Sequence, residues 1–214
     1  MEERLQAHID TLIERYPKLS VCETQLEIAY QILESAYTNG RKLLVCGNGG
    51  SASDSEHIVG ELMKEFKLKR KVYAGQAELM KSIDPEMGLI LAENLQGALP
   101  AITLTGHSSL TTAFMNDSEP ELVFAQQVNG YGKTDDVFLG ISTSGNSRNV
   151  LYAAITAKSK GLKVLGLTGM KESKLKRLAD VCICVPETET YKIQELHLPV
   201  YHCLCMMLEE HFFG

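Results

Sequence analysis

A histidine and a glutamate, His57 and Glu61, stand four residues apart in a segment with the hydrophobic periodicity of a helix. About one helical turn separates them, so both side chains lie on one face and can reach the same ion or substrate. An imidazole and a carboxylate in this arrangement could transfer protons or bind a metal. Taken alone, the pair also fits an ordinary exposed helix face.

A glycine-rich turn comes just before this pair. The segment Lys42–Ser51 runs from an apolar stretch into Cys-Gly-Asn-Gly-Gly-Ser, and the helical pattern follows. Such a turn exposes backbone N–H groups, and the helix behind it adds the positive end of its dipole. A phosphate group is therefore the expected ligand.

A second turn of this kind follows the apolar run Val137–Ile141. Its sequence, Ser-Thr-Ser-Gly-Asn-Ser over residues 142–147, supplies hydroxyl and N–H donors without a formal charge. This composition suits a phosphomonoester that must be bound and then released. The alternative is an ordinary serine N-cap of the next helix.

The last helical pattern begins near Ile193 and contains the polar residues Gln194, His197 and His202. On a regular helix, Gln194 and His202 lie about 12 Å apart along the axis, and Pro199 should kink the helix between them. A lone histidine here is usually a core residue. A shared role for Gln194 and His202 requires the kink or a neighbouring subunit.

The rest of the chain predicts one α/β domain over residues 1–214. Five short apolar runs alternate with helical stretches, which predicts a five-stranded parallel sheet covered by helices on both sides, as in a flavodoxin-like three-layer sandwich. Two additional helices are expected before the first run, separated by Pro17. The expected helices are Glu2–Tyr16 and Cys22–Tyr37, and the strands are Leu43–Cys46, Ala101–Leu104, Val137–Ile141, Val164–Leu167 and Val181–Val185.

Two segments leave alternatives open. The first helix carries an apolar stripe formed by Leu5, Ile9, Leu12 and Ile13. This stripe either packs on its own domain or packs against a helix of another subunit. Residues 1–40 are therefore candidates for an oligomer interface. The interval 71–100 contains two short helical patterns broken at Pro85, and it reads as an insertion that passes over an active-site edge or as decoration.

Composition excludes several classes of partner. The 214 residues are 44% hydrophobic and carry a net charge of −6, which argues against nucleic acid and anionic membranes as partners. No apolar stretch approaches the roughly 18 residues of a membrane span, and the amino terminus lacks a signal-peptide core. The six cysteines lie in apolar patterns without a CxxC pair, so free thiols in a reducing cytoplasm are expected.

Four separated motifs together resemble the phosphoheptose isomerases of the sugar isomerase (SIS) family. They are the glycine-rich turn, the His57/Glu61 pair, the turn at 140–147, and Ile-Gln-Glu at 193–195 followed by His202. The similarity covers about residues 43–66 and 116–214. It implies an SIS-type domain, a homotetramer, and a ketose–aldose isomerase that needs no nucleotide. The implied reaction converts sedoheptulose 7-phosphate to D-glycero-D-manno-heptose 7-phosphate through an enediol.

The resemblance also implies roles for individual residues. Glu61 and His202 would be the catalytic acid and base. In family members that carry zinc, the positions of His57, Glu61, Gln194 and His202 are the ligands, residue types that zinc accepts. The substrate contacts would be Asn48, Gly49, Gly50, Ser51, Glu61, Asn116, Asp117, Ser142, Thr143, Ser144, Ser147 and Gln194.

Two departures concern the substrate. Family members usually have an arginine in place of Glu65, and the interval 71–100 is longer than in the compact enzymes. Both features lie near the expected substrate, so the alternative is an isomerase for a sugar phosphate other than a heptose phosphate. Lys64 or Lys67 could replace the missing positive charge.

Two other functions compete with the isomerase. Some SIS-family tetramers are not enzymes and bind the bacterial replication initiator, but those relatives lack the matching glutamate and terminal histidine that this chain retains. A dinucleotide site is the third class, because Gly47, Gly49 and Ala52 formally satisfy the Rossmann fingerprint. That fingerprint also needs an acidic residue about 20 positions on, at the end of a second strand, and none is evident.

Overall fold

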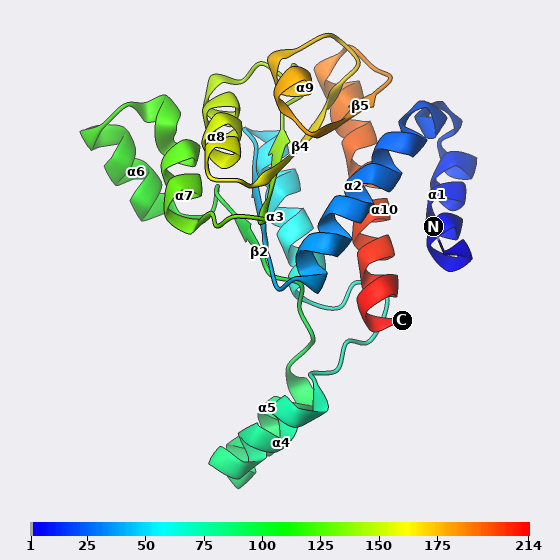
Figure 1. Ribbon diagram of the computed structural model, residues 1–214, viewed down its shortest axis with the longest axis vertical. Helices are drawn as coiled ribbons and strands as arrows, with labels where there is room; N and C mark the ends of the chain where they lie inside the picture. Colours follow the sequence, from blue (N-terminus) through cyan, green and yellow to red (C-terminus); the bar gives the residue numbers. More distant parts are fainter. Residues whose placement is uncertain (1) are drawn as a thin grey trace.

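The computed structural model describes residues 2–214 as a sheet of five parallel strands with helices on both faces (Figure 1). The strand order is β2-β1-β3-β4-β5, the order of flavodoxin-like folds. The strands are β1 (Leu43–Cys46), β2 (Ala101–Thr103), β3 (Val137–Ile141), β4 (Lys163–Gly169) and β5 (Val181–Val185). The predicted fold class is confirmed, and all five expected strands are present.

The helices surround this sheet in chain order. The α-helices are α1 (Glu3–Arg15), α2 (Glu23–Thr38), α3 (Gly50–Met63), α4 (Ala74–Ile83), α5 (Pro85–Asn94), α6 (Ser108–Asp117), α7 (Val123–Tyr131), α8 (Arg148–Ser159), α9 (Lys174–Leu178) and α10 (Thr190–Phe213). A 3₁₀ helix, η1 (Pro17–Cys22), connects α1 to α2, and a second, η2 (Pro120–Leu122), connects α6 to α7. Within residues 2–214, no helix combines the length and apolar character that crossing a bilayer requires.

Alternate residues of each strand feed two separate cores. Leu43 and Val45 of β1 face α2, α3 and α10, whereas Leu44 and Cys46 face the layer of α7, α8 and α9. Strand residues point to opposite faces in turn, so one short apolar run serves both layers. This explains why the strands are apolar throughout.

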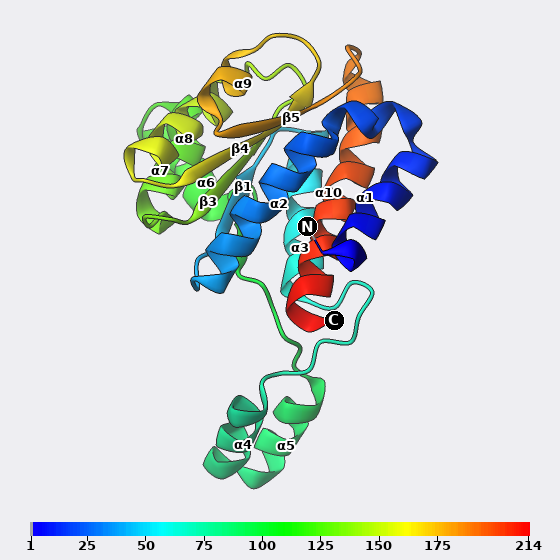
Figure 2. The same ribbon diagram turned by 45° about the vertical axis from the view of Figure 1, so that its right-hand side comes forward.

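The first helix is covered within its own subunit. Leu5, Ile9 and Leu12 of α1 are buried, and α1 packs along α10 (Figure 2). Of the two readings of its apolar stripe, packing on its own domain is the one observed. The stripe therefore gives no support for a helical partner.

Pro199 does not end the last helix. α10 runs from Thr190 to Phe213 with Pro199 inside it. Buried residues on both sides of the proline, Leu196 and Val200 among them, hold the helix in the core. Tertiary packing here compensates for the backbone hydrogen bond that proline cannot make.

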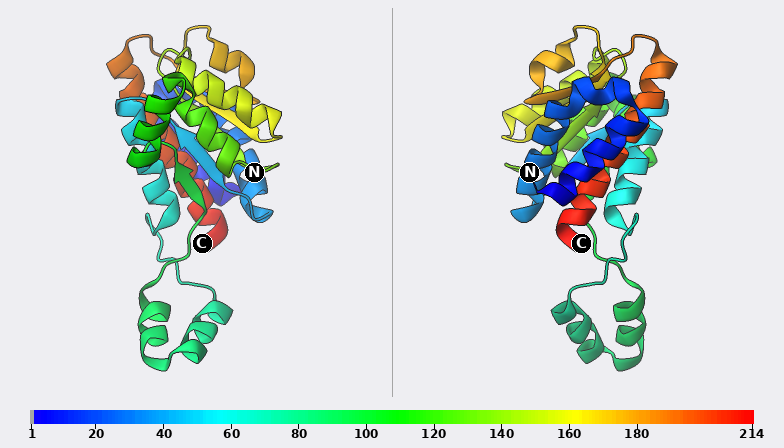
Figure 3. Two further views of the ribbon diagram at one scale, coloured as in Figure 1. Left: turned by 90° about the vertical axis from the view of Figure 1, so that its left-hand side faces the viewer. Right: turned by 90° about the vertical axis from the view of Figure 1, so that its right-hand side faces the viewer.

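The interval 71–100 forms a helical hairpin that leaves the body of the protein. α4 and α5 pack on each other and extend away from the sheet and its covering helices (Figures 1 and 3). A bridge between Lys71 and Gln96 closes the base of the hairpin. Within one chain the hairpin projects away from the phosphate turns, while Gln96 at its base accepts the Glu65 N–H just after α3. Its expected passage over an active-site edge stays a prediction.

Candidate active site

The two glycine- and serine-rich turns lie side by side at one edge of the sheet. β1 and β3 are parallel neighbours with Cys46 opposite Gly140, so the turns that follow them leave the same edge together. The chain reverses its direction of winding between these strands, and such a switch point is where open α/β sheets bind ligands. The tertiary structure thus brings together the two predicted phosphate turns.

An amide pair joins the two turns. Asn48 donates to Asn149 Oδ1 over 2.9 Å, and Asn149 donates in return to Asn48 Oδ1 over 2.8 Å. Asn149, in the first turn of α8, did not stand out in the sequence. The pairing spans about a hundred residues, and no local pattern signals it.

Both helices behind the turns begin without a side-chain cap. Gly49 precedes α3 with φ of +56°, and Ser147 precedes α8. Neither makes a capping hydrogen bond, because Gly49 has no side chain and the Ser147 hydroxyl pairs with Ser142 at 2.9 Å. Ser51 and Ala52 donate their N–H groups to the carbonyls of Asn48 and Gly49, and Val150 donates to Asn149 Oδ1. The N–H groups of Gly50, Arg148 and Asn149 are therefore the ones available to an anion.

The second turn places its hydroxyl groups in different positions. Ser142 is buried, while Thr143 and Ser144 line a hollow of about 300 Å³ whose walls also include Lys171. Gly145 has φ of +63° and faces the Ser173 side chain at a distance that leaves no room for a Cβ. Lys171 is a positive charge near the turn that the sequence did not indicate.

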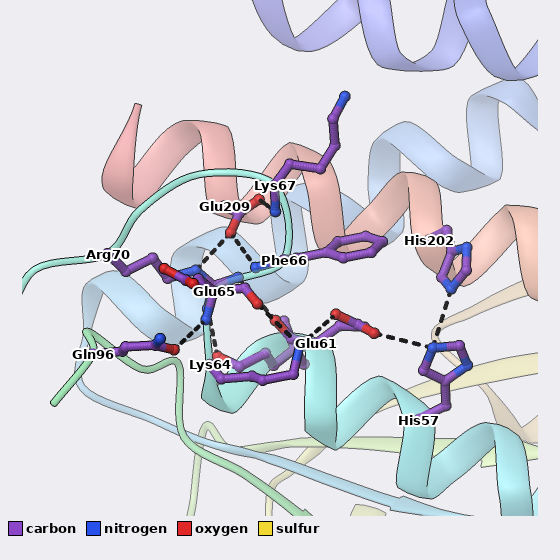
Figure 4. A network of polar contacts seen from close by, with 11 residues as sticks. His57, Glu61, Lys64, Glu65, Phe66, Lys67, Arg70, Gln96, His202 and Glu209 are labelled. Atoms are coloured by element: carbon purple, nitrogen blue, oxygen red, sulfur yellow. Dashed lines mark hydrogen bonds and ion pairs between the residues drawn. The ribbon is translucent and has the colours of Figure 1, made fainter. Parts of the chain in front are cut away.

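Glu61, His57 and His202 form a polar cluster farther along α3 and α10 (Figure 4). His57 Nε2 lies 3.0 Å from Glu61 Oε1 and 3.5 Å from His202 Nε2. The Glu61 side chain is largely buried, and Lys64 Nζ lies 3.3 Å from its other oxygen. Burial lowers the pKa of His202, and His57 lowers it further. The predicted acid–base pair is thus in one place, with His57 between the two groups.

A buried tyrosine orients His57. Tyr201 OH lies 3.0 Å from His57 Nδ1 and donates to Asp54 Oδ1 over 3.3 Å. When the tyrosine proton points to Asp54, the Tyr201 oxygen can accept only from a protonated Nδ1 of His57. In the neutral ring, His57 Nε2 is then an acceptor that faces a carboxylate oxygen and a second imidazole.

This arrangement of acceptors fits a cation. A tetrahedral ion with bonds of about 2.1 Å holds its ligand atoms about 3.4 Å apart, close to the two distances around His57 Nε2. The ligand set is nevertheless incomplete within one chain. Over residues 2–214, no three histidine, cysteine, aspartate or glutamate side chains form a ready metal-binding group.

Gln194, the fourth predicted ligand, lies at the phosphate turn. A Cβ placed on Gly50 would lie 2.6 Å from Gln194 Nε2, so the glutamine amide covers the start of α3. His202 is about two helical turns farther along α10. Within one chain, Gln194 is therefore apart from His57, whose Nε2 lies near both Glu61 and His202.

Asn116 and Asp117 are also apart from the cluster. They end α6, are exposed, and share a hydrogen bond of 2.8 Å. α6 packs on η2 and α7, and Figure 1 shows it well away from α10. Within one chain, the helix that carries these two residues thus lies apart from α10.

A buried ion pair supports the end of α3 below Glu61. Arg70 donates to the backbone oxygens of Glu61 and Leu62 and to the carboxylate of Glu209, each over 2.8 Å. Both side chains of the pair are almost fully buried. In the sequence, Arg70 lies within the basic run Lys-Leu-Lys-Arg-Lys over residues 67–71, and nothing local indicates its burial.

The Rossmann alternative has no structural counterpart. After α3 the chain passes through a loop into the α4–α5 hairpin, and β2 does not begin until Ala101. The acidic residue at the end of a second strand, which a dinucleotide site needs, therefore has no position here.

Comparison with known proteins supports the resemblance seen in the sequence. Residues 107–207 match the sequence profile of the SIS domain. The chain is 36% identical to the phosphoheptose isomerase of Aneurinibacillus thermoaerophilus over 216 aligned residues, covering 100% of this chain and 96% of that one. It is 37% identical to the Helicobacter pylori (strain P12) phosphoheptose isomerase, covering 99% and 95%.

Solved structures agree. The phosphoheptose isomerase of Francisella tularensis superimposes with a TM-score of 0.75 at 29% identity, over 97% of each chain. That of Neisseria gonorrhoeae gives 0.73 at 30% identity, over 97% of this chain and 98% of the other. From its turns, its helix order and these full-length matches, the chain belongs to the phosphoheptose isomerase family of SIS-domain proteins.

Proposed function

We propose that the protein interconverts sedoheptulose 7-phosphate and D-glycero-D-manno-heptose 7-phosphate. One observation carries this proposal: the glycine-rich turn at the start of α3, beside the second turn, and the Glu61/His202 cluster are connected by α3 and α10. At about 1.5 Å per residue along the axis of α3, His57 lies roughly 10 Å and Glu61 roughly 16 Å from Gly50. That separation suits an extended seven-carbon sugar with its phosphate at one end and its reacting carbons at the other.

The phosphate would bind between the two turns. Its proposed contacts are Asn48, Gly49, Gly50, Ser51, Ser142, Thr143, Ser144 and Ser147. Support comes from the uncapped starts of α3 and α8 and from the amide pair that fixes the turns relative to each other. Neutral donors spaced over two helix starts bind a phosphate without trapping it permanently.

The chemical step is a proton transfer between adjacent carbons. In the ketose-to-aldose direction a base removes a proton from C1 to give an enediol, and an acid returns a proton to C2. The C1 hydroxyl becomes the aldehyde, and the ketone oxygen becomes a hydroxyl. Glu61 and His202 are the proposed acid–base pair, because they approach from different helices on either side of His57.

We also propose that His57, Glu61, Gln194 and His202 hold a zinc ion. Zinc would polarise the substrate oxygens and stabilise the negative charge of the enediolate. This assignment is supported by His57 Nε2 and the two atoms near it, Glu61 Oε1 and His202 Nε2. Titration of metal-free protein with zinc, followed by calorimetry, should give one site per chain that is lost in His57→Ala.

The two groups missing from the cluster point to a neighbouring subunit. Gln194 lies at the phosphate turn, and Asn116 and Asp117 lie away from α10. We propose a homotetramer in which one subunit completes the substrate site of another. The six unpaired thiols fit a reducing compartment such as the cytoplasm.

The test combines a substrate panel with two substitutions. Ketose phosphates of five to seven carbons are incubated with the enzyme, and aldose formation is followed by NMR. Glu61→Gln and His202→Asn should each lower the rate about 100- to 10,000-fold. Glu93→Gln on α5 and His211→Asn near the end of α10 are matched controls and should retain wild-type rates. Solvent deuterium entering substrate at the wild-type rate in either site variant would refute the assignment.

A further inference from the structure

The α4–α5 hairpin, called the arm below, is packed with its large apolar residues outward. α4 and α5 meet along a seam of small or half-buried residues, where Gly88 is buried against the Met80 backbone too closely for any Cβ. Leu79, Ile83, Met87, Ile90 and Leu91 lie outside this seam and are between 43% and 77% exposed. The arm therefore does not bury its own apolar surface.

These five residues share one side of the arm. Helical spacing places Leu79 and Ile83 in one stripe of α4, and Met87, Ile90 and Leu91 in one stripe of α5. The helices are antiparallel, so both stripes fall on the same side of the Gly88 seam. We call this surface the apolar face of the arm.

The area of this face is sufficient for an interface between proteins. Five side chains of this size at these exposures present on the order of 500 Å² of apolar surface. Two such faces together bury about 1,000 Å², the lower limit for a specific interface. The area of one face is also as large as that of the largest apolar patch that a monomer ordinarily exposes, about 300–600 Å².

Charge excludes an anionic partner. Over residues 74–94 the arm has a single basic residue, Lys81, against Glu78, Asp84, Glu86 and Glu93. Anionic lipid or nucleic acid would meet net negative charge around the apolar face. The arm extends away from the body, so none of the other described helices covers it (Figure 2).

We propose that the apolar face of the arm pairs with the same face of a second copy of this chain. A two-fold axis brings the same surface of both subunits together, and this face is apolar across both helices, hence self-complementary. α4 and α5 have ten residues each, so two arms match in length and form a short four-helix bundle. The pairing is independent of the proposed activity, because the arm contains none of the proposed site residues.

The experiment compares opposite sides of the arm. Ile83→Glu/Ile90→Glu places charge in the apolar face, whereas Leu89→Glu places the same charge on the other side of α5, where Leu89 is 45% exposed. Molar mass is measured by light scattering, and hydrogen exchange is followed in peptides covering residues 74–94. Circular dichroism verifies that the body of each variant is folded.

If the arms pair, the amide hydrogens of residues 74–94 should exchange at least tenfold faster in the double variant than in the wild type. In Leu89→Glu they should exchange at the wild-type rate. Mass should fall twofold if the arms alone join the subunits, and should remain constant if the bodies also contact each other. Unchanged protection in the double variant would overturn the proposal. So would a wild-type protein with the mass of one chain, or one that gains arm protection only on anionic vesicles.

Discussion

Arg70 and Glu209 offer the sharpest test of how the site is supported. The two side chains are almost fully buried, and Arg70 makes three hydrogen bonds of 2.8 Å, two of them to the last turn of α3. Glu209 also accepts the backbone N–H groups of Phe66 and Lys67. Arg70→Met keeps the aliphatic stem but removes the charge and all three donors.

The expected cost is large. Removing one partner of a buried ion pair leaves an unpaired charge and costs about 3–5 kcal/mol of the free energy of unfolding. For a chain of this size that lowers the melting temperature by about 6–20 °C. The variant should also lose isomerase activity, since the freed carbonyl groups belong to Glu61 and Leu62. Equilibrium unfolding in urea and calorimetry measure the first effect, and the NMR assay measures the second.

The control is Arg148→Met, which breaks an exposed pair with Glu121. An exposed pair contributes at most about 1 kcal/mol, so this variant should unfold almost as the wild type does. The double variant Arg70→Met/Glu209→Leu should cost less than the sum of its parts, because no lone charge remains. If Arg70→Met is no more destabilising than Arg148→Met, the buried pair does not support α3 as described.

Three further predictions follow from the same structure. Burial would raise the pKa of Glu209, but the Phe66 and Lys67 N–H groups and Arg70 outweigh burial and lower that pKa. The pair therefore stabilises the fold at pH values above the ordinary glutamate pKa. The free energy of unfolding, measured at decreasing pH, should lose this contribution as the pH falls through the lowered pKa. Tyr201→Phe removes the hydroxyl that orients His57 and should weaken zinc binding about 10- to 100-fold in competition with a chelator, with melting temperature as the control. Ser144→Ala should raise KM about two- to tenfold with little change in kcat, and an unchanged KM would place the phosphate elsewhere.

The sequence determined the features that depend on neighbouring residues. Apolar runs predicted the strands of the sheet, and the serine- and glycine-rich turns predicted where two helices begin. The four-residue spacing placed His57 and Glu61 on one face. Each of these follows from the period of a helix or strand, or from the backbone freedom of glycine, and needs no information about distant parts of the chain.

Tertiary structure alone decided which distant residues meet. The amide pair between Asn48 and Asn149, the contact of Tyr201 with His57, and the burial of Arg70 against Glu209 each join segments separated by about 100 residues or more. The outward direction of the arm was equally hidden, because periodicity identifies an apolar stripe but does not identify what covers it. Contacts of this kind are set by the packing of whole layers, and a local sequence pattern carries no record of them.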